Sequence, residues 1–269
     1  MTMTVPVEPK PAASVMLVRP SAPGAPEPLE VYMIRRNKGM KFLGGYYAFP
    51  GGKVDPSDAA ADSLARCRGI AATAAEAALG DDAVVTPLAY WVTAVRELLE
   101  ESGILLACHE DGRPVDVSRP SEAEAIERCR KDLMAGAPFA GLLSDAGWFC
   151  DLRPLRYVSH FVTPRTSPIR FTARFFLCPV PAGQAPRLFT EETSEGFWIH
   201  PGEGYRRFIA DEMAMAEPAE YGLGYLAQFA SLDEVWRCHV DGALKFRGIV
   251  DRIDAFWKDF DWKANRWTR

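Results

Sequence analysis

A chain of 269 residues with a net charge of −5 is long enough to bury a core and too acidic for broad nucleic-acid binding. Its content of 48% hydrophobic and 25% charged residues is ordinary for a soluble globular protein. The six cysteines contain no Cys-x-x-Cys pair, which excludes a zinc ribbon and favours reduced thiols in a cytoplasmic protein. No apolar run reaches membrane-spanning length.

The first elements along the chain are strands that lead into a glycine turn. Residues 1–12 are rich in Pro and Thr and lack an apolar core, so we expect a disordered tail. Residues 14–18 and 31–35 are predicted strands on either side of a Pro/Gly-rich loop, and 46–49 is a short aromatic strand. From 31 to 53 the chain is basic and holds no acidic residue, which suits a small polyanionic ligand; a solvated basic loop is the alternative. The basic residues are Arg35, Arg36, Lys38, Lys41 and Lys53.

The clearest element is a helix over 87–102. Thr86 is the predicted N-cap, Pro87 takes the first helical position, and Gly103 ends the helix. An apolar stripe at helical spacing covers one side: Leu88, Trp91, Val92, Val95, Leu98 and Leu99. The other side carries three neighbouring carboxylates, Glu97, Glu100 and Glu101. Because three like charges so close repel, we expect them to face a cation.

Helices and strands continue to alternate downstream. We expect a buried strand over 104–108, a peripheral amphipathic helix over 121–134, and strands over 155–163, 169–180 and 197–200. Side chains alternate along a strand, so Arg170 and Arg174 share a face, where phosphate binding and solvent exposure are both open interpretations. Residues 59–85 are helix-prone, and 202–269 is a mainly helical extension. This order predicts one α/β domain over 13–269.

The glycine turn and the acidic helix together resemble the signature of the Nudix hydrolases. That signature is Gly, five residues, Glu, seven residues, then Arg-Glu-U-x-Glu-Glu-x-Gly-U, where U is bulky and aliphatic. Gly52 takes the first position, and 96–104 satisfies every later one. Asp58 replaces the first Glu, and the thirty-seven residues of 59–95 replace the interval of seven. Loop-closure entropy makes this insertion cost only roughly 1.5 kcal/mol.

A long interruption at this point resembles the coenzyme A diphosphatase branch of the family. The upstream element of that branch is Arg, a small residue, three residues, Arg, three, Gly, three, then Phe-Pro-Gly-Gly. This chain offers Arg36, Asn37, Lys41, Gly45 and 49–52 at the same spacing. Lys in place of Arg loses a bidentate grip on phosphate, so the substrate stays open. The resemblance implies a Nudix fold, in which a mixed β-sheet is sandwiched between helices.

The resemblance also implies an activity, which is metal-dependent hydrolysis of a diphosphate bond in a nucleoside diphosphate-linked substrate. Coenzyme A or acyl-coenzyme A is the first expectation. ADP-ribose, a dinucleotide or a nucleotide sugar is the alternative, and a non-catalytic nucleotide-binding module is a third. The expected partner is therefore a small-molecule nucleotide, without nucleic acid or membrane, and a homodimer is left open.

The implied site has three groups of residues. Glu97, Glu100, Glu101 and the Gly51 carbonyl would hold Mg²⁺ or Mn²⁺. Arg96 would orient Glu100, and Glu100 or Glu101 would act as the base. Substrate would be bound by Arg36, Lys41, Gly52, Lys53, Arg170 and Arg174, and Asp58 and Glu192 are additional candidates.

Overall fold

The computed structural model describes residues 7–40, 42–80, 83–165, 167–188 and 193–238, and the backbone of 260–261 and 266–267. The chain divides into two compact units. The first unit consists of the described residues within Met1–Val15 and Pro50–Glu191, and the second of those within Met16–Phe49 and Glu192–Arg269. Within the described part, none of the helices has the length and apolar character of a membrane-spanning segment.

In the first unit, the leading half of strand β1 (Lys10–Pro20) pairs antiparallel with β4 (Gly51–Lys53). β1 also pairs with β9 (Phe171–Pro179), which pairs antiparallel with β8 (Arg156–Val162). Because β1 begins at Lys10, the expectation of a disordered tail through residue 12 is wrong at its end. The apolar side chains that follow draw this segment into the core.

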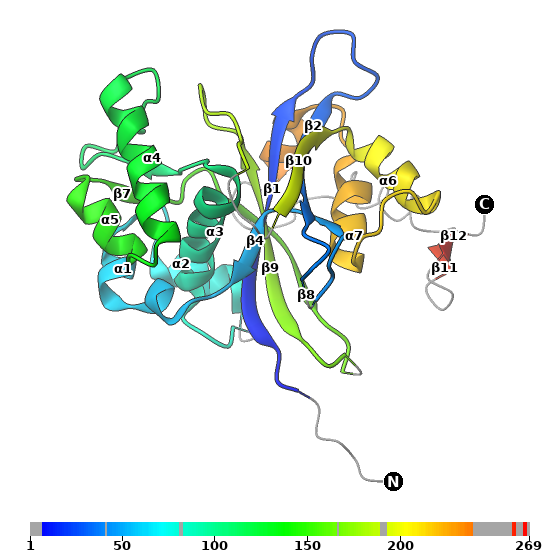
Figure 1. Ribbon diagram of the computed structural model, residues 1–269, viewed down its shortest axis with the longest axis horizontal. Helices are drawn as coiled ribbons and strands as arrows, with labels where there is room; N and C mark the ends of the chain where they lie inside the picture. Colours follow the sequence, from blue (N-terminus) through cyan, green and yellow to red (C-terminus); the bar gives the residue numbers. More distant parts are fainter. Residues whose placement is uncertain are drawn as a thin grey trace. The chain divides into compact units, whose positions relative to one another are not determined.

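Helix α3 (Pro87–Ser102) is the centre of the helical part of the first unit. It has the predicted length, all six residues of its apolar stripe are buried, and Gly103 ends it in the left-handed conformation at φ 73°. Thr86 precedes the helix, but its side chain makes no capping hydrogen bond within the described part. The 3₁₀ helix η1 (Pro56–Ala59), at the start of the insertion, contacts α3. Within the insertion, α1 (Ala61–Ala65) and α2 (Ala72–Leu79) also contact α3 (Figure 1). The helical character expected of 59–85 is therefore confirmed for these segments.

A small three-stranded sheet in the first unit was not expected. β5 (Cys67–Arg68) runs parallel to β7 (Phe149–Asp151), and β7 pairs antiparallel with β6 (Ala107–Cys108). Only the last two residues of the predicted strand 104–108 enter a sheet, although all of it is buried. Strands of two or three residues are too short to show a period in the sequence.

Helix α4 (Pro120–Met134) matches the predicted amphipathic helix. It contacts α3, and α5 (Phe139–Asp145) packs against it in turn (Figure 1). It buries the apolar face that the pattern predicted, with four buried side chains: Ile126, Cys129, Arg130 and Leu133.

In the second unit, β2 (Leu29–Arg36) pairs antiparallel with the far half of β1, with β3 (Tyr47–Ala48) and with β10 (Thr193–Ile199). Helices α6 (Pro201–Ile209), α7 (Glu217–Leu226) and α8 (Leu232–Cys238) follow, and α6 packs on α7. The helical extension is thus confirmed as far as 238. Nearer the end of the chain, the prediction of helix is wrong for two short strands that pair with each other, β11 (Phe260–Asp261) and β12 (Arg266–Trp267). The α/β class is confirmed, and a single domain over 13–269 stays a prediction.

Candidate active site

Strand β4 presents backbone groups to the end of helix α3. The hydrogen bond from the Val15 N–H to the Pro50 carbonyl sets the register between β1 and β4. Because bonded and non-bonded pairs alternate in an antiparallel ladder, both peptide groups of Gly51 face away from β1. The Gly51 N–H donates to Glu101 Oε2 at 2.7 Å. The Gly51 carbonyl faces this same edge, beside a carboxylate from α3.

Gly52 is needed for the close approach of a second carboxylate. A Cβ built on Gly52 would lie 2.3 Å from Glu97 Oε1 and 2.7 Å from Glu97 Oε2. Any side chain at this position would therefore displace Glu97. The side chain of Glu97 is only 12% exposed, so the turn holds the carboxylate in a sheltered place. The two glycines thus bring together the bend and the acidic helix that the sequence separates.

Arg96 links the carboxylates to one another and to the glycine turn. Its Nη1 donates to Glu97 Oε1 at 2.9 Å and to Glu100 Oε1 at 3.2 Å, which confirms the expected contact with Glu100. Its Nη2 donates to the Lys53 carbonyl at 2.9 Å, and its Nε donates to Asp58 Oδ1 at 2.9 Å. A planar guanidinium with five donors can fix several acceptors at once, so Arg96 holds both glutamates in position.

Asp58 is the buried counter-ion that accepts hydrogen bonds from Arg96. The residue is 1% exposed, and its carboxylate also accepts from Thr93 Oγ1 at 2.8 Å and from the Asp55 N–H at 2.9 Å. The last bond is half of a capping box that closes η1. The carboxylate is therefore saturated with protein donors and anchors the arginine.

Burial and neighbouring charges set the protonation of this cluster. Burial, with a smaller contribution from the charge of Glu100, raises the pKa of Glu97 to about 7, although the charge of Arg96 opposes this shift. Burial lowers the pKa of Arg96, but its hydrogen bond to Asp58 and the nearby carboxylates outweigh burial and hold the pKa above its usual value. Arg96 is therefore a permanent cation among the carboxylates.

The residues at this edge fit a hard divalent cation. Within the described ranges, no three acidic, His or Cys side chains stand as a ready metal cage. Arg96 engages Glu97 and Glu100, and Glu101 accepts from the Gly51 N–H. Carboxylate and carbonyl oxygens are nonetheless the ligands that Mg²⁺ and Mn²⁺ prefer. The absence of a side chain at Gly52 lets the Glu97 carboxylate approach the backbone of the glycine turn, and the Gly51 N–H holds Glu101 at the same edge.

Sequence reasoning missed the residue that fixes the end of α3. Arg130 on α4 is 2% exposed, and its Nη2 donates to the Glu100 carbonyl at 2.8 Å and to the Arg187 carbonyl at 3.1 Å. A Cβ on Gly103 would lie 2.6 Å from Arg130 Nη1. A cation is favourable at a helix C-terminus, where carbonyls lack partners. The signal in the sequence was the spacing of four residues between Ile126 and Arg130, which places both side chains on the same face of the predicted helix.

The two arginines expected to bind substrate are buried. Arg170 is 8% exposed and donates to the carbonyls of Thr163 and Val7. Arg174 is 1% exposed, donates to the Tyr157 hydroxyl at 3.3 Å and lies over the ring of Tyr90. The interpretation of solvent exposure is therefore wrong for both, because Arg174 on β9 and Arg170 just before it are buried in the first unit.

The remaining candidates fall in different places. Lys53 is exposed and contributes its backbone carbonyl to Arg96. Arg36 ends β2 in the second unit and is half-buried. Lys41 and Glu192 lie outside the described residues.

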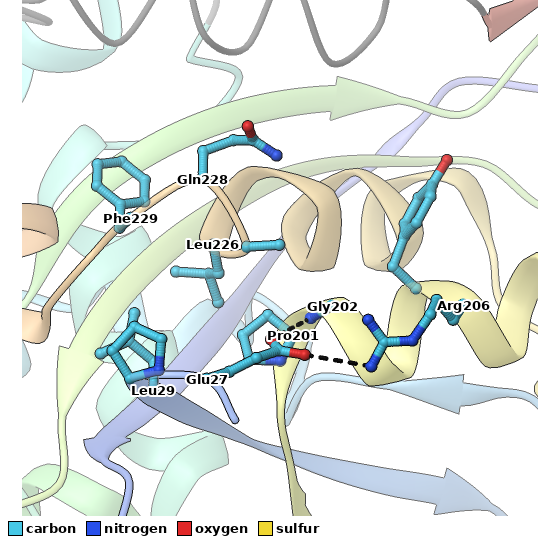
Figure 2. A pocket seen from close by; sticks show the side chains of 11 residues that line it. Glu27, Leu29, Pro201, Gly202, Arg206, Leu226, Gln228 and Phe229 are labelled. Carbon is cyan, nitrogen blue, oxygen red and sulfur yellow. Dashed lines mark hydrogen bonds and ion pairs between the residues drawn. The ribbon is translucent and has the colours of Figure 1, made fainter. Parts of the chain in front are cut away.

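A cavity in the second unit is a separate feature (Figure 2). Its volume is about 320 Å³, and Glu27 and Arg206 are among its lining residues. Glu27 accepts from the Gly202 N–H at 2.7 Å and from Arg206 Nη2 at 3.4 Å. The N-terminus of α6 is thus capped by the protein's own carboxylate. Among the described residues, none of the predicted site residues lines this cavity.

Comparisons with known proteins agree on one family. The family profile described as NUDT19 Nudix domain matches residues 65–226. A protein of Caenorhabditis elegans, "Putative nudix hydrolase 7", is 30% identical over 203 residues, covering 76% of this chain and 57% of the relative. "Acyl-coenzyme A diphosphatase NUDT19" of Gallus gallus is 29% identical over 276 residues, covering 87% of this chain and 72% of the relative.

A solved structure adds the fold. The crystal structure of a NUDIX hydrolase from Alicyclobacillus acidocaldarius superimposes with a TM-score of 0.69 at 32% sequence identity. The match covers 84% of this chain and 94% of that one. The chain spans little more than half of the worm relative, at 57%, but nearly all of the bacterial one.

Proposed function

Since this chain belongs to the Nudix hydrolase family, we propose that it hydrolyses the diphosphate bond of coenzyme A or an acyl-coenzyme A. The observation that carries the reaction type is the cluster in which Arg96 joins Glu97 and Glu100 while Glu101 meets the Gly51 N–H. A module that only binds nucleotides has no need of three carboxylates at one helix end.

The choice of substrate has two supports. The upstream element from Arg36 to the 49–52 turn has the spacing of the coenzyme A branch. The relative from Gallus gallus carries the name of an acyl-coenzyme A diphosphatase. One observation favours the alternative of ADP-ribose, a dinucleotide or a nucleotide sugar: Lys41 replaces an arginine of that element.

The reaction in this proposal would use Mg²⁺ or Mn²⁺, which Glu97, Glu100, Glu101 and the Gly51 carbonyl would hold. When bound there, such a cation would neutralise charge on the phosphate oxygens and lower the pKa of a bound water. The chain's own residues do the rest. Arg96 keeps two carboxylates in fixed rotamers, and the Gly51 N–H restrains the third.

Glu100 and Glu101 are the two candidates for the base that takes the proton from the attacking water. Glu100 is the more exposed, at 27% of its side chain, whereas Glu101 is 6% exposed as a residue. A cytoplasmic location and a homodimer stay predictions from the sequence.

The test is a product assay with Mg²⁺ or Mn²⁺ and a panel of nucleotide diphosphates. Release of adenosine 3′,5′-bisphosphate would mark coenzyme A cleavage, and cleavage of ADP-ribose alone would support the alternative. Glu101→Gln should raise the activation free energy by about 2–3 kcal/mol, which lowers turnover roughly 30- to 150-fold. Glu76→Gln, at an exposed position on α2, is the matched control and should leave turnover unchanged. Normal turnover by the Glu101 variant would contradict the assignment.

A further inference from the structure

The small sheet of the first unit places two cysteines opposite one another. β5 and β7 pair in parallel with Cys67 in register with Cys150. Register partners direct their side chains to the same face, and neighbouring strands lie about 4.8 Å apart. Disulfides join Cα atoms that are about 4.4–6.8 Å apart, so this pairing brings the two thiols within bonding range.

The two thiols differ in access to solvent. Cys67 is half-buried, and its Sγ donates to the Ser63 carbonyl at 3.4 Å. Cys150 is 1% exposed. A hydrogen bond with Cys67, together with burial, raises the pKa of the Cys150 thiol. An oxidant in solution therefore reaches Cys67 first, and Cys150 is its partner on the neighbouring strand.

The third cysteine of this sheet cannot take the place of either one. β6 pairs with β7 so that Ala107 lies opposite Cys150, and Cys108 lies opposite Phe149. Because side chains alternate, Cys108 projects from the other face of the sheet. It provides a matched control on the same three strands.

We propose that Cys67 and Cys150 are a peroxide-sensitive thiol pair that closes to an intramolecular disulfide. The Cys67 thiolate attacks hydrogen peroxide, the O–O bond breaks, and a sulfenic acid forms with release of water once the proton is transferred. The Cys150 sulfur then attacks the Cys67 sulfur, which forms the S–S bond and releases a second water. Two thiols are oxidised, and one peroxide is reduced to two waters.

The Cys67–Cys150 pair is linked by hydrogen bonds to the segment that carries Asp58, the residue that anchors Arg96. Cys67 bonds the Ser63 carbonyl, and Ser63 Oγ donates to the Ser57 carbonyl at 2.6 Å, next to Asp58. Closing the bridge removes the Cys67 hydrogen from this chain of contacts. The modification itself does not depend on the proposed hydrolysis, so the two can fail separately.

The experiment treats the full-length folded protein with hydrogen peroxide, removes the peroxide, and then unfolds the protein in the presence of the alkylating reagent so that every free thiol is blocked. Peptide mapping without reduction should show a peptide pair joined through Cys67 and Cys150, lighter by two hydrogen atoms than its parts. Cys67→Ser should abolish this linked pair, and Cys108→Ser should retain it. In Cys150→Ser, a sulfenic acid should persist at Cys67 and react with a 1,3-dione probe.

A second measurement covers the case in which a variant does not fold. In the unaltered protein, peroxide should remove alkylation of Cys67 and Cys150 in equal amounts. Loss at Cys67 alone, a bridge that includes Cys108, or a bridge that forms only in urea would overturn the proposal.

Discussion

Replacing Asp58 by Asn tests the buried ion pair that supports the active site. Asn keeps the size of the side chain but exchanges one acceptor oxygen for an NH₂ donor. Among the described residues, the Arg96 guanidinium and the Asp55 N–H can only donate to this carboxylate, and the Thr93 hydroxyl also donates to it. The variant therefore places donors against donors and leaves the buried Arg96 without its full counter-charge.

The expected loss follows from this geometry. Removing one partner of a buried ion pair costs about 3–5 kcal/mol. Asp58 and the Arg96 side chain are 1% and 9% exposed, so solvent screens the pair little. We expect Asp58→Asn to lower the free energy of unfolding in guanidinium chloride by about 3–5 kcal/mol. Turnover should fall at least tenfold, because Arg96 no longer fixes Glu97.

An exposed ion pair provides the control. Glu195 accepts from Arg35 at 2.8 Å, and its side chain is 49% exposed. Glu195→Gln should change the free energy of unfolding by less than about 1 kcal/mol, since water and salt screen such pairs. If Asp58→Asn costs no more than this control, the inference that Asp58 anchors Arg96 is wrong.

Three further changes test other parts of the molecule. Gly52→Ala should weaken Mn²⁺ binding at least about tenfold in calorimetry, because the added Cβ displaces Glu97. Unchanged affinity would contradict the inference that Gly52 makes room for the Glu97 carboxylate. Arg130→Leu should lower the free energy of unfolding by about 1–3 kcal/mol by removing a donor from the end of α3, whereas the exposed Arg128→Leu should have little effect. Burial raises the pKa of Glu220 from 4.5 to about 7, so its contribution to stability falls as pH rises between these values. Glu220→Gln should therefore stabilise the protein by up to about 3 kcal/mol more at pH 8 than at acidic pH, and equal melting shifts at pH 8 and pH 4 would refute this.

The sequence determined the parts of the site that depend on local spacing. Helical periodicity gave α3 and its buried stripe, and Gly103 gave its end. The same periodicity places Arg96 one turn before Glu100, and the structure confirms their contact. The glycine turn could be recognised because only glycine permits such a close approach of backbone to a carboxylate.

Tertiary structure alone decided the contacts between segments that are distant in the chain. Asp58 reaches Arg96 across 38 positions, and Arg130 reaches the Glu100 carbonyl across 30. A pattern of residues gives the face of an element, but it does not give the partner that packs against that face. For this reason Arg174 could not be assigned to solvent or interior from alternation alone. The pairing of Cys67 with Cys150 was hidden because β5 and β7 have only two and three residues, too few to show a period.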